Sequence, residues 1–169
     1  MPKSKPTGKT QKKKIVSPID DPYLSLWVLL DQTRDTIAKA RELELDHYKL
    51  SRVQVAVLYT LMSENRGLTI AEIANWNVRE HNSVLSLVNR MDRIGLVNKV
   101  RNANDNKVRI ILTEKGRKLY TNASRLSLEM IFSILSEEEK KQLESTLKKL
   151  RTTSRELLGI GYKPPFLPK

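Results

Sequence analysis

The sequence predicts a mainly α-helical protein with one small β-hairpin. Apolar residues recur at helical spacing over most of the chain. Ser51, Thr69 and Ser136 are each followed, three residues later, by Gln or Glu, which is the capping-box pattern that begins a helix. Residues 96–101 and 107–112 alternate like strands and flank an Asn/Asp-rich turn. We therefore expect a winged helix-turn-helix lobe carried on a helical dimerisation platform.

The composition is that of one strongly basic domain. The chain has 169 residues, which is long enough to bury a core without disulfides, and it contains no cysteine. Lys and Arg number 31 against 19 Asp and Glu, a net charge of +12. Six of the lysines lie in the first fourteen residues, but the remainder still carries +6. This excess favours a polyanionic partner.

The first 20 residues predict a disordered basic arm, because they are rich in Lys, Pro, Ser and Thr and poor in large apolar side chains. Such a segment is either a tail that only adds solubility or an electrostatic arm on DNA. Asp21 before Pro22 predicts the start of a long helix that ends near Leu45. Its apolar stripe is too long for one short neighbour, which favours a helix at a subunit boundary.

Two short helices and a polar-faced third helix follow. Ser51 begins a helix to Glu64, and Thr69 begins a short helix through Ala74. A turn at residues 75–78 leads into a helix over residues 79–95, which ends at Gly95. This order is that of a helix-turn-helix, and the hairpin after it would be the wing.

The helix over residues 79–95 has two unlike sides. Val84, Leu87, Val88, Met91 and Ile94 share one side and predict a core-facing surface. The opposite side carries short amide and hydroxyl groups first and arginines later. Groups that both donate and accept suit base edges in a groove, and arginines suit phosphates. This pattern predicts a recognition helix.

The last third of the sequence predicts more helices for dimerisation. Thr113 begins a long helix with apolar residues from Leu119 to Ile134 on one side, and Ser136 begins a final helix that ends near Leu158. Residues 159–169 contain prolines that exclude a helix, so we expect a Pro-rich tail.

The sequence resembles the MarR family of bacterial winged helix-turn-helix transcription regulators. The likeness lies in LTIAEIANW (residues 68–76), NSVLSLVNRMDRIGLV (residues 82–97) and NDNKVRIILTEKG (residues 104–116). A more limited likeness, in residues 20–32, is to the regulators of this family found beside reductive dehalogenase genes. The resemblance implies a MarR-like domain over residues 21–158. Its winged lobe would be residues 51–113, and residues 22–45 and 114–158 would form the dimerisation helices.

The resemblance also implies a function. A homodimer would read a pseudo-palindromic operator, with helix 79–95 in the major groove and wing 102–107 in the minor groove. In the family the wing carries Asp-x-Arg; here Asp105 matches, but Lys107 stands in place of the arginine. Lysine cannot make the forked contact of arginine, so we expect weaker minor-groove readout. Many members also bind a small aromatic or phenolic effector.

The candidate DNA-binding residues lie on this helix and the wing. Asn82 either pairs with a base or caps its own helix, and Lys107 either binds DNA or protects a strand edge. Arg109 would share a strand face with Lys107. His81 either contacts a phosphate or is simply exposed to solvent. The full set is Arg79, His81, Asn82, Ser83, Ser86, Asn89, Arg90, Arg93, Asp105, Lys107 and Arg109.

An effector pocket would lie between the dimerisation helices and the lobe. Its candidate residues are Trp27, Arg34, Tyr59, Met62 and Met130. Aromatic residues and methionines at helical spacing are also ordinary core residues. Arg34 would hold a phenolate or pair with a carboxylate across the dimer.

Other functional classes have little support in the residues. His47 and His81 are the only histidines and lie far apart in sequence, so we expect no metal site and no cofactor. No nucleophile or Gly-rich phosphate loop stands in a recognisable motif, so we expect no enzyme. No apolar run is long enough to span a membrane, and we expect a soluble, cytoplasmic protein. The alternative to a sequence-specific regulator is a non-specific nucleic-acid-binding protein, architectural or RNA-binding.

Overall fold

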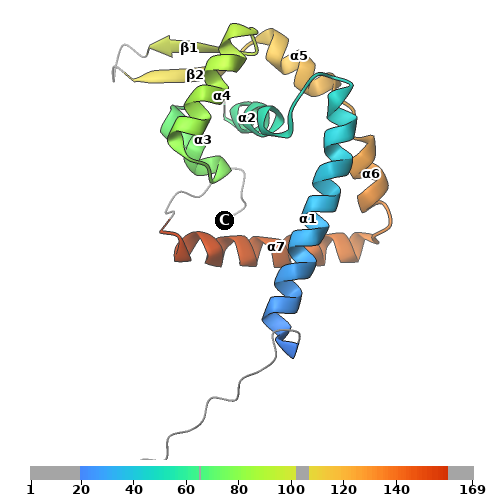
Figure 1. Cartoon of the computed structure of the whole chain (residues 1–169). Coiled ribbons are helices and arrows are strands. Elements are labelled where there is room, and N and C mark those ends of the chain that lie inside the picture. The colour runs from blue at the N-terminus through green and yellow to red at the C-terminus, as the bar shows by residue number, and fades with distance from the viewer. Residues whose placement is uncertain (1–19, 65, 102–106, 160–169) are drawn as a thin grey trace, which may run out of the picture. The chain divides into compact units, whose positions relative to one another are not determined.

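The computed structural model describes residues 20–64, 66–101 and 107–159, and Figure 1 shows their seven helices and two strands. The predicted basic arm before residue 20, the wing turn with Asp105, and the tail after residue 159 lie outside these residues. The chain divides into two compact units, one ending at Thr36 and one beginning at Ile37. Helix α1 (Pro22–Asp46) contributes residues to both units.

The first unit contains the start of α1. The Asp21 carboxylate accepts hydrogen bonds from the backbone N–H groups of Tyr23 and Leu24, at 2.8 and 3.3 Å, so the predicted helix start is confirmed. Large apolar side chains of this stretch are exposed to solvent, among them Leu26, Trp27 and Leu29. In the part of the chain that the structure describes, no helix is long and apolar enough to cross a membrane.

The second unit contains the end of α1 and all later elements. The sequence predicted the order of these elements up to and including the hairpin. It also predicted the three capping boxes, which are all present at Ser51, Thr69 and Ser136. The elements are α2 (Arg52–Ser63), α3 (Ile70–Asn77), α4 (His81–Arg93), β1 (Val97–Arg101), β2 (Val108–Leu112), α5 (Glu114–Asn122), α6 (Leu126–Phe132) and α7 (Glu137–Leu157).

The predicted hairpin is confirmed. Strands β1 and β2 pair antiparallel, with Val97 opposite Leu112. Leu68, just before α3, joins the same sheet through two backbone hydrogen bonds with Ile110, at 3.0 and 2.7 Å. Gly67 has a left-handed φ of 68°, and a Cβ there would lie 2.8 Å from Cγ2 of Ile111. Only glycine therefore fits where the chain passes the hairpin.

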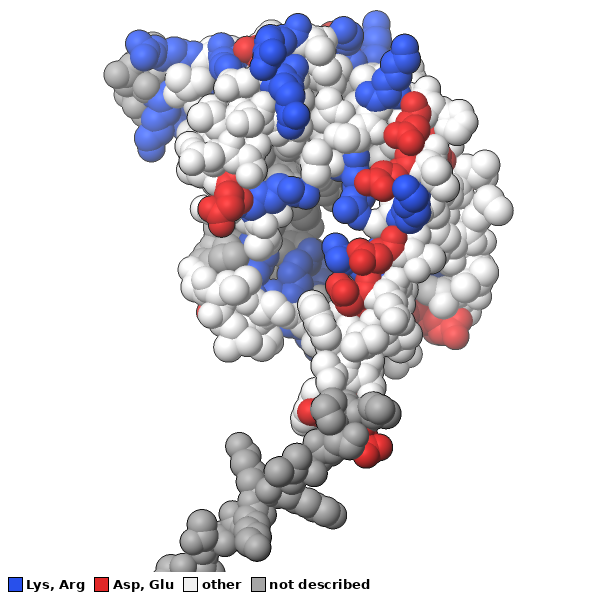
Figure 2. Space-filling view, in the orientation of Figure 1, with Lys and Arg blue, Asp and Glu red and all other residues white. Residues whose placement is uncertain are grey.

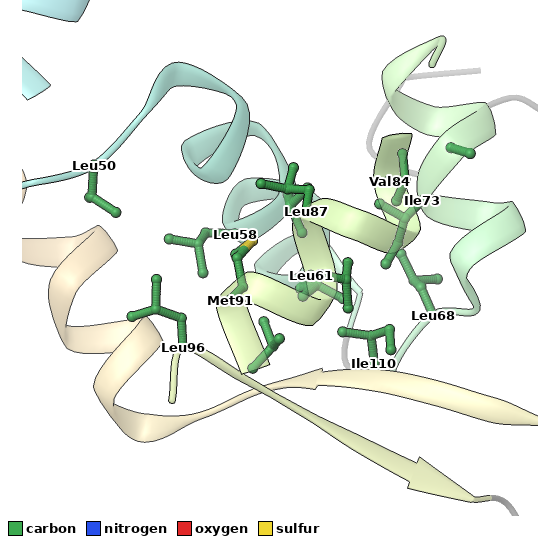
Figure 3. Packing of buried hydrophobic residues seen from close by; sticks show 14 of the residues in the cluster. Leu50, Leu58, Leu61, Leu68, Ile73, Val84, Leu87, Met91, Leu96 and Ile110 are labelled. Atoms are coloured by element: carbon green, nitrogen blue, oxygen red, sulfur yellow. The ribbon is translucent and has the colours of Figure 1, made fainter. Parts of the chain in front are cut away.

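The core of the second unit lies beneath α4. Side chains from α2, α3, α4 and the hairpin converge there (Figure 3), including Leu58, Leu61, Ile73, Val84, Met91 and Ile110. Leu58, Ile73, Val84, Met91 and Ile110 are completely buried. The hydrophobic free energy of this cluster fixes the position of α4, whose inner side supplies four of its residues.

One long predicted helix is in fact two. The expected helix after Thr113 stops at Asn122, and α6 begins only at Leu126. Ala123 has an extended conformation, and the hydroxyl groups of Ser124 and Ser127 donate to the Glu44 carboxylate of α1. The prediction of a continuous helix was wrong because this partner lies 80 residues earlier in the sequence.

Glu44 is the centre of a polar contact between α1 and the α5–α6 break. Arg41, one turn earlier, pairs with Glu44 and also donates to the carbonyl of Ser124. Burial opposes ionisation of Glu44, but the hydrogen bonds from Ser124, Ser127 and Arg41 outweigh it and lower the pKa from 4.5 to about 2. The carboxylate is therefore held in its charged form.

Candidate nucleic-acid interface

Helix α4 separates its buried and exposed residues as the sequence predicted. Val84, Leu87, Val88 and Met91 are buried in the core. Asn82, Ser83, Ser86, Arg90 and Arg93 are exposed. Ile94 was predicted on the buried side but is 49% exposed, because the helix ends at Arg93 and Ile94 is already its C-cap. The polar side of α4 is thus an accessible surface, with short side chains at its start and arginines toward its end.

The start of α4 bears on the capping interpretation of Asn82. Glu80 is the N-cap, and no side chain makes a capping hydrogen bond there. Asn82 lies two residues further on, inside the helix, with its side chain exposed. Asn82 is therefore not the N-cap residue, and its side chain lies on the exposed surface.

Arg79 and His81 also lie at this end of α4. Both are exposed. The backbone N–H of Arg79 donates to the carbonyl of Ala74 at 3.0 Å, which fixes the turn between α3 and α4. The structure thus brings Arg79, His81, Asn82 and Ser83 together on one exposed corner.

A lysine that the sequence reasoning did not select ties the wing to α4. Lys99 of β1 donates to the side-chain oxygen of Asn89 and lies 3.5 Å from the carboxylate of Asp92. The side-chain oxygen of Asn89 therefore accepts one hydrogen bond within the chain, and its NH2 group can still donate. Asp92 and Lys99 carry opposite charges and lie on either side of the Gly95 turn, and this pattern could have predicted their contact.

The two predicted basic residues of the wing, Lys107 and Arg109, differ in exposure. Lys107 is exposed directly before β2. Arg109 lies 3.9 Å from the carboxylate of Glu72 in α3, and only 21% of its side chain is exposed. Arg66 also pairs with Glu72, at 2.9 Å. Arg109 is thus directed toward α3, so the expectation that it reaches phosphate alongside Lys107 has weak geometric support.

Glu72 supports α3 and the base of the wing together. Burial opposes its ionisation, but hydrogen bonds from Thr69 and the contact with Arg66 outweigh this effect and lower its pKa. The carboxylate also closes the capping box of α3. A charged Glu72 therefore fixes α3, the helix that precedes α4.

Positive side chains gather on the wing side of the second unit. Figure 2 shows Lys and Arg concentrated along the edge formed by the hairpin and the neighbouring parts of α4 and α5. Arg90 and Arg93 occupy the last turn of α4, where the helix dipole favours positive charge. This surface combines short polar groups for base edges with cations for phosphates.

The five candidate effector residues are divided between the two compact units. Trp27 and Arg34 belong to the first unit, and Tyr59, Met62 and Met130 to the second. Arg34 pairs with Asp31 and Asp35 of its own helix, at 3.2 and 2.8 Å.

Met130 alone among these lines a groove of about 450 Å³ at the α5–α6 break. The groove is bounded by Leu43, Glu44, His47, Tyr48, Ser124, Leu126, Ser127 and Met130. Its surface is mostly apolar, with the Glu44 carboxylate and its serine partners as the polar edge. Among residues 20–64, 66–101 and 107–159, no cluster of three or more His, Cys, Asp or Glu could hold a metal ion.

Comparison with known proteins agrees with this geometry. Residues 50–116 match a family described as winged helix DNA-binding domain. A search of curated proteins finds no significant match.

Three solved structures illustrate the likeness. The ligand-free, organohalide-sensing RdhR transcriptional regulator is 31% identical, covers 81% of this chain and 83% of its own, and has a TM-score of 0.72. A MarR family protein from Bacillus stearothermophilus is 28% identical. The match covers 78% of this chain and 94% of that protein's chain, with a TM-score of 0.65. A mutant of MarR from E. coli, in complex with operator DNA, is 19% identical. The match covers 76% of this chain and 94% of that protein's chain, with a TM-score of 0.69.

Proposed function

The chain belongs to the MarR family of winged helix DNA-binding transcription regulators, and we propose that it is a repressor that binds a pseudo-palindromic operator as a homodimer. Its role would be regulatory rather than enzymatic, and it would act on DNA in the cytoplasm. The observation that carries this proposal is the exposed polar side of α4, held outward by a fully buried core.

Helix α4 would enter the major groove and the wing at residues 102–107 the minor groove. Three exposed residues of the helix are short enough to fit closely against base edges: Asn82, Ser83 and Ser86. Arg90 and Arg93 lie further along, where they would contact phosphates. Lys107 would supply a positive charge to the minor groove without the fork of an arginine.

The homodimer is supported by apolar side chains that this chain leaves uncovered. Leu143, Leu147 and Leu150 follow one another at helical spacing on α7 and are 36%, 41% and 51% exposed. Met130 and Ile134, just before α7, are more exposed still. Contiguous apolar surface of this kind is rare on a monomeric protein and is typical of a subunit interface.

The decisive experiment is a competition shift assay with duplex DNA from upstream of the protein's own gene. Retention of the labelled duplex under excess random DNA supports the proposal. Loss of the duplex under the same excess supports the alternative, a non-specific nucleic-acid binder, which the net charge of +12 favours. Absence of any shift contradicts both.

A small aromatic or phenolic effector is the further partner that we propose. One solved form of RdhR, 28% identical with a TM-score of 0.72, contains 2,4-dichlorophenol. The apolar groove at the α5–α6 break, which includes Met130 and Tyr48, would accept such a ring. Titration with 2,4-dichlorophenol should release bound DNA, whereas cyclohexanol should not. Equal release by both compounds, or by neither, contradicts the proposal.

A further inference from the structure

Arg155 of α7 makes a contact that the proposed function does not use. It is 9% exposed, and no other charged residue in the described part of the chain is as buried. Its Nη2 atom donates to the carbonyl of Trp76 at 3.0 Å and lies 3.5 Å from the carbonyl of Asn75. Both carbonyls belong to the last turn of α3, 79 and 80 residues earlier in the sequence.

The position suits a cation. The last carbonyls of a helix have no partner within it and form the negative end of its dipole. A guanidinium there makes charge-assisted hydrogen bonds, which are stronger than those between neutral groups. Burial lowers the pKa of Arg155, and the neighbouring Arg151 lowers it further. A buried guanidinium is retained only where such hydrogen bonds offset its desolvation.

One of these carbonyls, that of Asn75, also takes part in the turn that leads into α4. The backbone N–H of Val78 donates to the carbonyls of Ala74 and Asn75, and the N–H of Arg79 donates to that of Ala74. Val78 has a left-handed φ of 50°, which a β-branched residue adopts only where its surroundings enforce it. Helix α4 begins three residues later, at His81. Arg155 therefore contacts the segment that sets where α4 starts.

We propose that Arg155 is a positioning residue that couples α7 to the DNA-reading helix by holding the last turn of α3. A displacement of α7 would move this turn and, through Val78, the start of α4. The inference rests on the proposed DNA binding. Arg155 would not touch DNA itself, because its side chain is buried.

The test compares Arg155→Met with Arg151→Met, which removes an exposed arginine one turn earlier on α7. Dissociation constants for operator and random DNA are measured over a range of salt concentrations. We expect Arg155→Met to weaken operator binding by roughly tenfold, the equivalent of one charged hydrogen bond. The salt slope should be unchanged, because no phosphate contact is lost.

Trp76 provides a second readout that does not depend on DNA. The chain has two tryptophans, so Trp27→Phe leaves Trp76 as the single tryptophan, whose emission can be excited selectively. In that background Arg155→Met should shift the emission of Trp76, whereas Arg151→Met should not. If Arg155→Met does not fold, Arg155→Gln, which keeps a donor, is measured in the same way.

Three results would overturn the proposal. A lower salt slope, by about 0.9 per copy of the chain, would make Arg155 a phosphate contact. A lower melting temperature with unchanged operator affinity of the folded protein would make its role merely structural. Unchanged Trp76 emission in Arg155→Met would mean that Arg155 does not hold the last turn of α3. If the wild-type protein bound no duplex, the proposed function would fail, and the Trp76 emission would still report on the contact.

Discussion

The winged lobe buries its apolar side chains, whereas the C-terminal helix α7 leaves several of its leucines exposed. In the lobe, Leu58 of α2 and Ile110 of β2 are completely buried. On α7, Leu147 is 41% and Leu150 is 51% exposed. The lobe completes its core within one chain, whereas α7 leaves an apolar surface uncovered. The stability of the lobe is therefore a property of the single chain, and that of α7 is expected to depend on a second one.

The largest effect that separates the two regions should come from matched leucine substitutions. Leu58→Ala should destabilise the lobe by about 3–5 kcal/mol, because it leaves a cavity in a closed core. Leu150→Ala should change the unfolding free energy of the chain little at low protein concentration. It should instead weaken dimerisation, since its side chain would be buried only in the dimer. Urea unfolding and sedimentation at several concentrations measure the two quantities.

Equal destabilisation by Leu58→Ala and Leu150→Ala at every concentration would contradict the comparison. The result would mean that α7 is packed within the single chain as firmly as the lobe.

Glu44, at the contact between α1 and the α5–α6 break, should make stability depend on pH. Its pKa of about 2 in the folded protein is below the ordinary value of 4.5. The unfolded chain therefore takes up a proton first as pH falls, so the stabilisation is complete above pH 4.5 and is lost toward pH 2. Urea unfolding at pH 7 and pH 3 measures how much of this stabilisation is lost as the pH falls.

Glu44→Gln is the matched variant for this measurement, because it removes the titrating group and keeps the size of the side chain. It should lower stability at pH 7 and flatten the loss between pH 5 and pH 2. An unchanged pH profile in this variant would show that other carboxylates cause the acid sensitivity.

Local sequence patterns predicted most of the lobe. The Ser51 and Thr69 capping boxes and the two-sided pattern of α4 depend on residues within one or two turns, so the sequence displays them directly. The alternation around residues 102–106 predicted the hairpin for the same reason.

Contacts between distant residues could not be predicted in this way. The break before α6 depends on Glu44, and the position of the α3 end depends on Arg155, both about 80 residues away from their partners. Within the site, alternation placed Arg109 beside Lys107 but could not reveal that Glu72 would attract its side chain. These features could not be predicted because each depends on a polar partner that is distant in the sequence.

The exposed corner of α4 should carry the sequence preference of the lobe. Asn82→Ala should cost about 1–3 kcal/mol at one base position, because the amide can pair with both the donor and the acceptor of adenine. The measurement is the ratio of operator to random-DNA affinity. Asn122→Ala, which alters an exposed asparagine at the end of α5, is the control and should leave the ratio unchanged. An unchanged ratio in Asn82→Ala would exclude it as a base contact.

The smallest effect should come from the wing. Lys107→Ala should weaken binding to all sequences about equally, because a lysine in the minor groove acts mainly through charge. If each copy neutralises one phosphate, the slope of affinity against salt should fall by about 0.9 per copy. Lys39→Ala removes an exposed charge on α1, outside the lobe, and should leave the slope unchanged. A change in operator preference with Lys107→Ala, at constant slope, would instead mean that the wing reads bases and that α4 shares its role with the hairpin.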